Sequence, residues 1–222
     1  MKVITRQPRH ILSLLVPIAI GCTAAVAATT VAAQTPYMGA EVQYTAVKDR
    51  AQENANALVN ALGGSASVTQ DRVAYAGRLF GGWEISENFA LELGYTQTND
   101  FGSKFNGRSS GGVSYDGSLE TSVSGFDYSI LLRPTKASGL NGLFFRVGGH
   151  RLTMQDTGTI SAGVSYTVTE KTTGSGYQYG IGYDGEAMQN WNYRVSATHV
   201  DKVAGISGAH ANFFGFGLLK KF

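Results

Sequence analysis

The chain has 222 residues, of which 43% are hydrophobic and only 15% are charged, well below the quarter that is usual in soluble domains. Glycine (29 residues) and aromatic residues (11%) are abundant, whereas proline (4 residues) is scarce. The net charge of +2 is small, so nothing in the composition supports nucleic-acid binding. This composition indicates β structure that lies against an apolar environment.

The first 33 residues have the pattern of a secretory signal peptide. Lys2, Arg6 and Arg9 form a basic segment, an apolar segment follows at residues 11–21, and residues 31–33 (Val-Ala-Ala) satisfy the small-x-small cleavage rule. We predict cleavage after residue 33, which divides the chain into a signal peptide (1–33) and a mature domain (34–222). Cleavage after residue 27 or 28 is the alternative. The apolar segment is about 10 residues long, too short for the roughly 20 that a spanning helix needs.

Cleavage at this site removes the only cysteine, Cys22. The mature chain then contains no thiol, which excludes disulfides and thiolate metal sites. In a lipoprotein, the alternative, Cys22 would instead be the acylated first residue. The basic excess also disappears, because three basic residues precede the cleavage site and no acidic residue does.

Apolar residues alternate with small or polar ones along the whole mature chain. In residues 87–97, for example, Leu91, Leu93 and Tyr95 share one parity and Glu92 lies on the other. Such period-two alternation predicts β-strands. It recurs in eight segments of the length that a tilted strand needs to cross hydrocarbon, at residues 37–47, 73–84, 87–97, 126–133, 143–152, 176–184, 191–200 and 209–222.

The connections between these segments alternate in length. Residues 85–88, 135–141 and 185–190 are predicted short turns. Residues 48–69, 99–117 and 155–171 are predicted long polar loops, and residues 203–208 a shorter fourth loop. This rhythm is typical of a barrel whose two termini lie in the periplasm and whose long loops lie outside. In the first loop, residues 55, 58, 59 and 62 have helical spacing, which fits a short amphipathic helix or a mobile loop equally well.

The parity opposite the large apolar residues carries charges at mid-strand. They are Glu41, Arg78, Glu92, Asp127, Arg146 and Arg194. A soluble barrel keeps an apolar interior, whereas a membrane barrel keeps a polar interior and an apolar outer face. We therefore predict an all-β, eight-stranded antiparallel up-and-down transmembrane β-barrel in a Gram-negative outer membrane, with these six residues forming an ion-paired layer in the lumen. A soluble periplasmic barrel that binds a lipid is the alternative.

Aromatic residues occur at strand ends, as in the girdles at a lipid–water boundary. The residues expected in the periplasmic girdle are Tyr37, Trp83, Phe89, Tyr183, Trp191 and Phe222. The last strand ends in an aromatic pattern, Phe214, Phe216, Leu218 and Phe222, which resembles the signal that barrel-assembly machinery recognises. Lys220 departs from that pattern, although its side chain is able to reach the interface.

Three segments resemble OmpA-like outer-membrane barrels. Residues 79–102 (LFGGWEISENFALELGYTQTNDFG) resemble the second and third strands of that family, residues 144–150 (FFRVGGH) the fifth, and residues 192–200 (NYRVSATHV) the seventh. The resemblance implies an interior ion pair between Glu92 and Arg194 that is linked to a gate. The family's exchanging basic residue and second acid correspond to Ile130 and Gly182, which puts a switchable gate in doubt. The family's peptidoglycan-binding domain is expected to be absent.

The expected function is a structural and surface-interaction role, and the alternative is a small gated or low-conductance pore. The expected partners are outer-membrane lipids including lipopolysaccharide, barrel-assembly machinery, periplasmic chaperones, and a host or phage surface partner that contacts the loops. We expect a monomer without cofactor, metal or nucleic acid. An enzyme at the barrel rim is a third reading, because His199, Asp201 and His210 lie near one another in the predicted topology. No positioned nucleophile accompanies them, so we expect no catalytic residues.

Overall fold

The structure, a computed structural model, describes residues 35–47, 65–70, 73–108, 112, 114–134, 141–162 and 164–222. The predicted signal peptide and the predicted helical segment of the first loop lie outside these residues. The described elements are β1 (Thr35–Val47), β2 (Ser65–Gln70), β3 (Val73–Glu84), β4 (Phe89–Thr98), β5 (Phe101–Arg108), β6 (Ser114–Leu132), β7 (Leu143–Ser161), β8 (Ser165–Met188), β9 (Trp191–Asp201), the 3-10 helix η2 (Val203–Gly205) and β10 (His210–Lys221).

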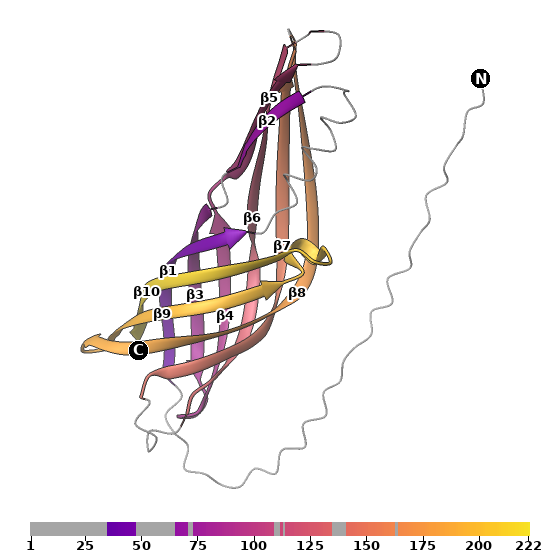
Figure 1. Cartoon of the computed structure of the whole chain (residues 1–222). Helices are drawn as coiled ribbons and strands as arrows, with labels where there is room; N and C mark the ends of the chain where they lie inside the picture. The colour runs from indigo at the N-terminus through magenta and orange to yellow at the C-terminus, as the bar shows by residue number, and fades with distance from the viewer. Residues whose placement is uncertain are drawn as a thin grey trace, which may run out of the picture. The chain divides into compact units, whose positions relative to one another are not determined.

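Eight of the strands pair in a closed ring. The order β6-β4-β3-β1-β10-β9-β8-β7 returns to β6 through a pairing of β6 with β7, and every pairing is antiparallel. The predicted eight-stranded up-and-down barrel is therefore confirmed (Figure 1). Strands β1 and β10, at the two ends of the described chain, pair with each other over Tyr37–Val47 and Ala211–Lys221. Closure leaves the ring without a free edge.

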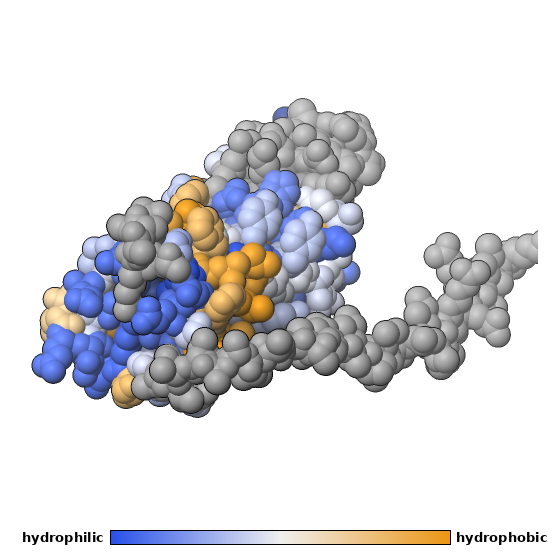
Figure 2. Space-filling model, turned by 90° about the horizontal axis from the view of Figure 1, so that it is seen from below, coloured by the Kyte–Doolittle hydropathy of each residue, from blue (hydrophilic) through white to orange (hydrophobic). Residues whose placement is uncertain are grey.

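The side chains alternate between an exposed apolar face and a buried inner face. On β3, Leu79 is 66% exposed whereas the neighbouring Arg78 is 3% exposed. The same holds on β6, where Phe126, Tyr128 and Ile130 point outward and Asp127 and Ser129 are buried. The apolar parity thus covers the outside of the barrel, which is the arrangement of a membrane-spanning barrel. From below, hydrophilic residues gather beside a patch of hydrophobic ones (Figure 2).

The two ends of the barrel differ. At one end, which we call the turn end, β1 begins and β10 ends. Tight turns there join β3 to β4 and β8 to β9. At the other end, the hairpin end, β6, β7 and β8 continue well beyond the neighbouring strands, with pairing from Asp116 to Ser161 and from Ser161 to Ser165. Strands β5 and β2 add to this extension by pairing with β6 and with β5 (Figure 1).

This extension corrects the prediction for two of the long loops. Residues 101–108 and 114–117 are strand rather than loop, and so are residues 155–161 and 165–171. In β7 and β8 the physical reason is the content of β-branched residues, because threonine hydroxyls pair directly across the two strands, as for Thr153 with Thr173 (2.9 Å) and Thr159 with Thr167 (3.2 Å). In β5 and β6 it is the burial of aromatic side chains, since Phe105 and Tyr115 are 7% and 5% exposed. Of the first predicted loop, residues 65–69 belong to β2.

The interior contains two apolar groups of residues as well as charges. At the hairpin end lies an apolar plug of Ala74, Ala76, Phe101, Val123, Leu152, Val200, Val203, Ala211 and Phe213. Towards the turn end lies an aromatic layer of Tyr37, Phe80, Ala90, Leu131, Phe144 and Leu219. The prediction that Tyr37 belongs to the outer girdle is wrong: Tyr37 is 3% exposed, because it shares the inward parity of Glu41 and Gln43.

No helix among the described residues is long and apolar enough to span a membrane.

Candidate functional site

The six charged residues predicted for the lumen come from six different strands. They are Glu41 on β1, Arg78 on β3, Glu92 on β4, Asp127 on β6, Arg146 on β7 and Arg194 on β9. Each is at most 5% exposed. Because inward-facing positions at similar depth meet across a narrow barrel, the six side chains come together in one ionic layer.

Glu92 is the centre of this layer. Its Oε1 accepts hydrogen bonds from Arg78 Nη2 (2.9 Å) and Arg146 Nη2 (2.8 Å), and its Oε2 accepts one from Arg194 Nη1 (2.5 Å). The hydroxyl of Tyr37 donates a fourth, also to Oε2 (3.1 Å). One carboxylate thus joins three strands' guanidinium groups, and charge-assisted hydrogen bonds of this kind are stronger than neutral ones.

Arg78 joins the layer to two further acids. Its Nη1 lies 3.1 Å from Glu41 Oε2, while its Nε and Nη2 donate to the two oxygens of Asp127 at 3.0 and 2.7 Å. The contact with Asp127 is bidentate, which fixes both position and orientation of the two groups. Neutral side chains also donate hydrogen bonds to these two carboxylates: Ser196 to Glu41 (2.9 Å) and Gln178 to Asp127 (3.2 Å).

A second group of ion pairs extends the layer towards the turn end, and sequence reasoning missed it. The carboxylate of Asp184 on β8 accepts hydrogen bonds from Arg194 Nε (2.6 Å) and Arg194 Nη2 (2.9 Å). Arg133 Nη2 lies 3.1 Å from Asp184 Oδ2. Arg133 also contacts Glu84 (2.6 Å), which in turn binds Lys221 (2.8 Å). The ten residues form one connected network of five basic and five acidic side chains, so its formal charge is zero.

The available signal for Asp184 was its parity. The family's second acid corresponds to Gly182, and the resemblance alone suggested that no such acid remained. Asp184 lies two residues further along β8, on the same inward face, and is 8% exposed. A carboxylate on β8 therefore does contact Arg194, from a position one inward step nearer the turn end.

Glycines on the inner face provide the space that the charged side chains occupy. A Cβ atom on Gly94 would lie 2.5 Å from Arg78 Nη2 and 2.6 Å from Asp127 Oδ2. A Cβ atom on Gly217 would lie 2.6 Å from Glu41 Cγ. The alternation of phenylalanine and glycine near the C-terminus therefore has two functions: the rings face outward, and the glycines leave room for the ionic layer.

The arginines also stack on the aromatic layer. The guanidinium carbon of Arg194 lies 4.6 Å from the ring centre of Phe80 and 4.8 Å from that of Phe144, and Arg78 lies 5.1 Å from Phe80. Cations over aromatic faces are attracted electrostatically, more strongly when they are shielded from water. The aromatic layer therefore contacts the ionic layer directly.

Little open space remains between the ionic layer and the apolar plug. A cavity of about 20 Å³ lies there, bordered by Asp127, Arg146 and His150 together with Leu152 and Phe213. This volume holds about one water molecule. Two buried atoms next to it, Arg146 Nε and His150 Nδ1, have no hydrogen-bond partner in the structure. Among the described residues, no group of histidine, cysteine or acidic side chains is arranged to hold a metal ion.

His199, Asp201 and His210, the residues considered for an enzyme at the barrel rim, lie at the hairpin end on the outer face. The rings of His199 and His210 are stacked with centres 5.8 Å apart, and Asn212 Oδ1 lies 2.7 Å from His199 Nδ1. Asp201 accepts hydrogen bonds from the hydroxyl of Tyr177 and from the backbone N–H of Lys202. The acid is thus engaged with donors other than histidine.

The residues expected to form the assembly signal share one face of the chain's end. Phe214, Phe216, Leu218 and Phe222 are all exposed on the outside of the barrel. The ammonium group of Lys220 lies 5.8 Å from the ring centre of Trp191 and 5.3 Å from that of Phe222. Lys220 therefore contacts the aromatic residues that surround it.

No protein-family model and no curated protein matches the chain. Solved structures do: Ail, the attachment invasion locus protein of Yersinia pestis, is 10% identical with a TM-score of 0.46, covering 85% of this chain and 97% of that one. OprG, an outer membrane protein of Pseudomonas aeruginosa, is 9% identical with a TM-score of 0.42, covering 85% and 95%. Neisserial surface protein A is 12% identical with a TM-score of 0.37, covering 84% and 97%.

In fold, the chain resembles OmpA-like eight-stranded barrels. At such low identity, the matches concern the fold alone. The ring of strands, the apolar outer face and the charged interior are properties of this chain's own structure.

Proposed function

We propose that the protein is an integral β-barrel of a Gram-negative outer membrane with a structural and surface-interaction role, and that it is not an enzyme. The observation that carries the proposal is the filled lumen. Between the apolar plug and the aromatic layer, the charges of the ionic layer are paired with one another, and the cavity beside them holds about one water molecule. A barrel filled in this way is a rigid element rather than a passage.

The expected localisation follows from the two ends of the barrel. The described chain begins and ends at the turn end, and residues 1–33 have the pattern of a secretory signal peptide. A chain delivered to the periplasm and inserted by barrel-assembly machinery and chaperones keeps its termini and short turns on the periplasmic side. The extension of β6, β7 and β8 then faces the cell exterior.

The surface role rests on this extension. Around the β7–β8 connection, Val164, Tyr166 and Val168 are 62%, 70% and 71% exposed. Large apolar side chains that project beyond a membrane-spanning region are suited to contact another macromolecule, such as a host or phage surface protein.

An epitope tag inserted between Ser161 and Ser165 tests the orientation. We expect antibody to label the tag on intact cells. Labelling only after the outer membrane has been made permeable would place the extension in the periplasm and contradict the proposal.

A small pore is the alternative, and the specific observation in its favour is the number of partners of Glu92. A carboxylate shared by three arginines is able to pair with them in several alternative ways. A change from one pairing to another would be needed to open a path for ions through the lumen. Recording in planar bilayers separates the two functions. We expect no conductance steps from the refolded protein, with a porin as the positive control for insertion. Reproducible steps that disappear in Arg194→Ala would support the pore and contradict the filled barrel.

A further inference from the structure

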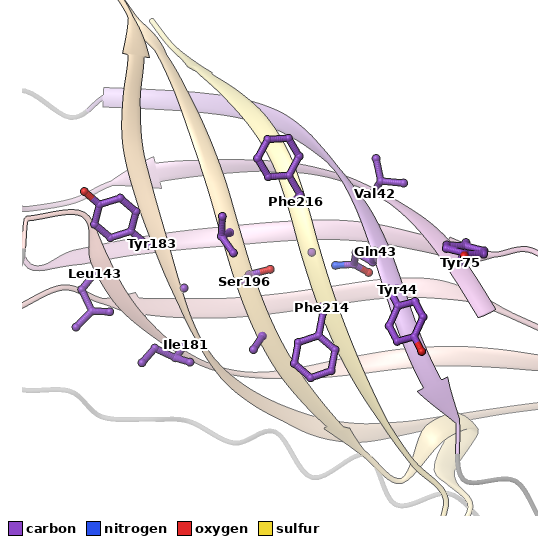
Figure 3. A pocket seen from close by; sticks show the side chains of 14 residues that line it. Val42, Gln43, Tyr44, Tyr75, Leu143, Ile181, Tyr183, Ser196, Phe214 and Phe216 are labelled. Atoms are coloured by element: carbon purple, nitrogen blue, oxygen red, sulfur yellow. The ribbon is translucent and has the colours of Figure 1, made fainter. Parts of the chain in front are cut away.

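A pocket at the turn end differs in chemistry from a depression on the outer face. The depression lies between Ile181, Tyr183, Phe214 and Phe216 on the parity that faces hydrocarbon, and none of the described residues that line it is charged (Figure 3). The turn-end pocket has a volume of about 670 Å³ and is lined mainly by polar side chains from β3, β8, β9, β10 and the segments between strands. This volume lies within the range of small-molecule sites.

The charged residues of the turn-end pocket are unequally paired. Its basic residues among those described, Arg133 and Lys221, contact Glu84 at 2.6 and 2.8 Å and belong to the neutral network of ion pairs. Glu87 also lines the pocket and already interacts with another residue. Glu186 is exposed, lies outside the network, and has no hydrogen-bond or ion-pair partner among the described residues. The pocket therefore contains a surplus carboxylate at Glu186.

A buried amide lies beside this carboxylate. Asn192 on β9 lines the pocket and is 9% exposed, and its side chain has no hydrogen-bond partner in the described part of the chain. It lies directly opposite Glu186 on β8, and the Cβ atoms of directly opposite residues are about 5 Å apart. Because buried polar groups are nearly always hydrogen-bonded, the pair indicates a ligand that donates hydrogen bonds to both side chains.

A primary ammonium group has the required chemistry. It carries a positive charge and several N–H donors but no acceptor, so one such group is able to contact the Glu186 carboxylate and Asn192 Oδ1 together. A metal ion fits less well, because no group of acidic or histidine side chains among the described residues is arranged to hold one. Pro134 and Tyr183 also line the pocket, and they offer an alkyl chain an apolar contact.

We propose that the turn-end pocket binds a small aliphatic amine, whose ammonium group contacts Glu186 and Asn192. The binding itself is independent of whether the lumen conducts. In the proposed orientation of the barrel the pocket faces the periplasm, and this part of the inference rests on the proposed function.

A titration of the refolded protein in zwitterionic micelles tests the site. The probes are butylamine, which is protonated at neutral pH, and tetramethylammonium, which has the same charge and as many carbon atoms but no N–H donor. NMR of nitrogen-labelled protein follows the side-chain amide signal of Asn192, identified by its absence from Asn192→Ala. We expect this signal to shift and saturate with butylamine but not with tetramethylammonium at the same ionic strength.

Two outcomes of the titration would overturn the proposal. A pocket that holds only water gives no saturable shift with butylamine. A diffuse attraction between cations and the acidic rim gives equal shifts with the two probes, because such attraction does not depend on N–H donors.

A matched pair of variants locates the binding. Glu186→Gln keeps the size of the side chain and removes its charge, so we expect it to weaken the binding of butylamine about tenfold or more, since hydrogen bonds to charged groups are the stronger ones. Glu170→Gln is the same change on the exposed hairpin-end part of β8, and we expect it to leave the binding unchanged. Equal effects of the two substitutions would contradict the assignment to Glu186.

The folding of each protein is checked first by a heat-dependent shift on gels. Should Glu186→Gln fail to fold, the comparison of the two cations on the wild-type protein still decides the proposal. A wild-type protein without the gel shift would contradict the membrane barrel itself. A shifted protein whose Asn192 signal does not respond to butylamine would contradict this inference alone.

Discussion

Glu92 shows how much a single residue contributes to the interior. It neutralises part of the charge on Arg78, Arg146 and Arg194 at distances of 2.5–2.9 Å. Desolvating charges is costly, and the cost is compensated only while the partners are present. Removing the shared carboxylate takes one hydrogen-bond acceptor from each of three buried guanidinium groups and leaves the ionic layer with one uncompensated positive charge.

The substitution Glu92→Ala is therefore expected to lower the free energy of unfolding by about 3–5 kcal/mol. Urea unfolding in detergent micelles measures the change. The control is Glu120→Ala, on the exposed part of β6, for which we expect about 0.5 kcal/mol or less. Similar effects from the two substitutions would show that the ionic layer does not hold the barrel together.

Two glycines, one on the inner face and one on the outer face, allow the same substitution to be compared on the two sides of the barrel wall. Gly94→Val places methyl groups where Arg78 and Asp127 now meet, and overpacking of this kind typically costs about 1–3 kcal/mol. Gly77→Val adds the same groups to the outer face, where nothing lies within 4 Å of an added Cβ. We expect Gly94→Val to lower the urea midpoint and Gly77→Val to leave it unchanged or raise it. The reverse order would contradict the assigned inward and outward faces.

The inward positions of the six predicted charges followed from parity, because a period of two assigns each residue to a face. Their partners did not follow, since parity carries no information on which strands face each other across the lumen. Asp184 illustrates the limit: its face was readable from the sequence, but its contact with Arg194 and Arg133 depends on the stagger of β8 against β9 and β6.

At the scale of elements, alternation located all eight strands of the ring but not the lengths of β6, β7 and β8. Within the barrel, the contrast between large apolar and charged residues is strong. On β8 in the extension, residues 165–171 are exposed on both faces, so alternation weakens, and threonine stands on both parities in residues 165–173. The content of β-branched residues was the remaining signal for strands there.

The part of the extension formed by β7 and β8 is expected to be dispensable for barrel formation. Met154 and Thr172 lie directly opposite each other on β7 and β8, so replacing residues 155–171 with an Asn-Gly turn closes the hairpin at that point. The ionic layer and the residues of the apolar plug are all retained. We expect the shortened protein to keep its heat-dependent gel shift after refolding into micelles. A chain that no longer shifts would show that the barrel needs residues 155–171 to fold.

At the scale of the whole molecule, the account depends on which solvent each face meets. Every strand of the ring pairs with a neighbouring strand on both sides, and such closure is the condition for a sheet to cross hydrocarbon. The outer face carries large apolar side chains over the whole circumference, among them Val42, Leu79, Leu93, Tyr128 and Phe216. In water this surface would promote aggregation, whereas in a bilayer it is the stabilising contact.

Quenching of tryptophan fluorescence by brominated lipids tests this central claim most directly. The chain contains two tryptophans, Trp83 and Trp191, and both side chains point outward near the turn end, 55% and 38% exposed. After refolding into vesicles, we predict strong quenching by bromine on the acyl chains near the carbonyls and weaker quenching by bromine at the chain ends. Fluorescence that is insensitive to brominated lipid, from a protein that stays monomeric in buffer without detergent, would contradict the account.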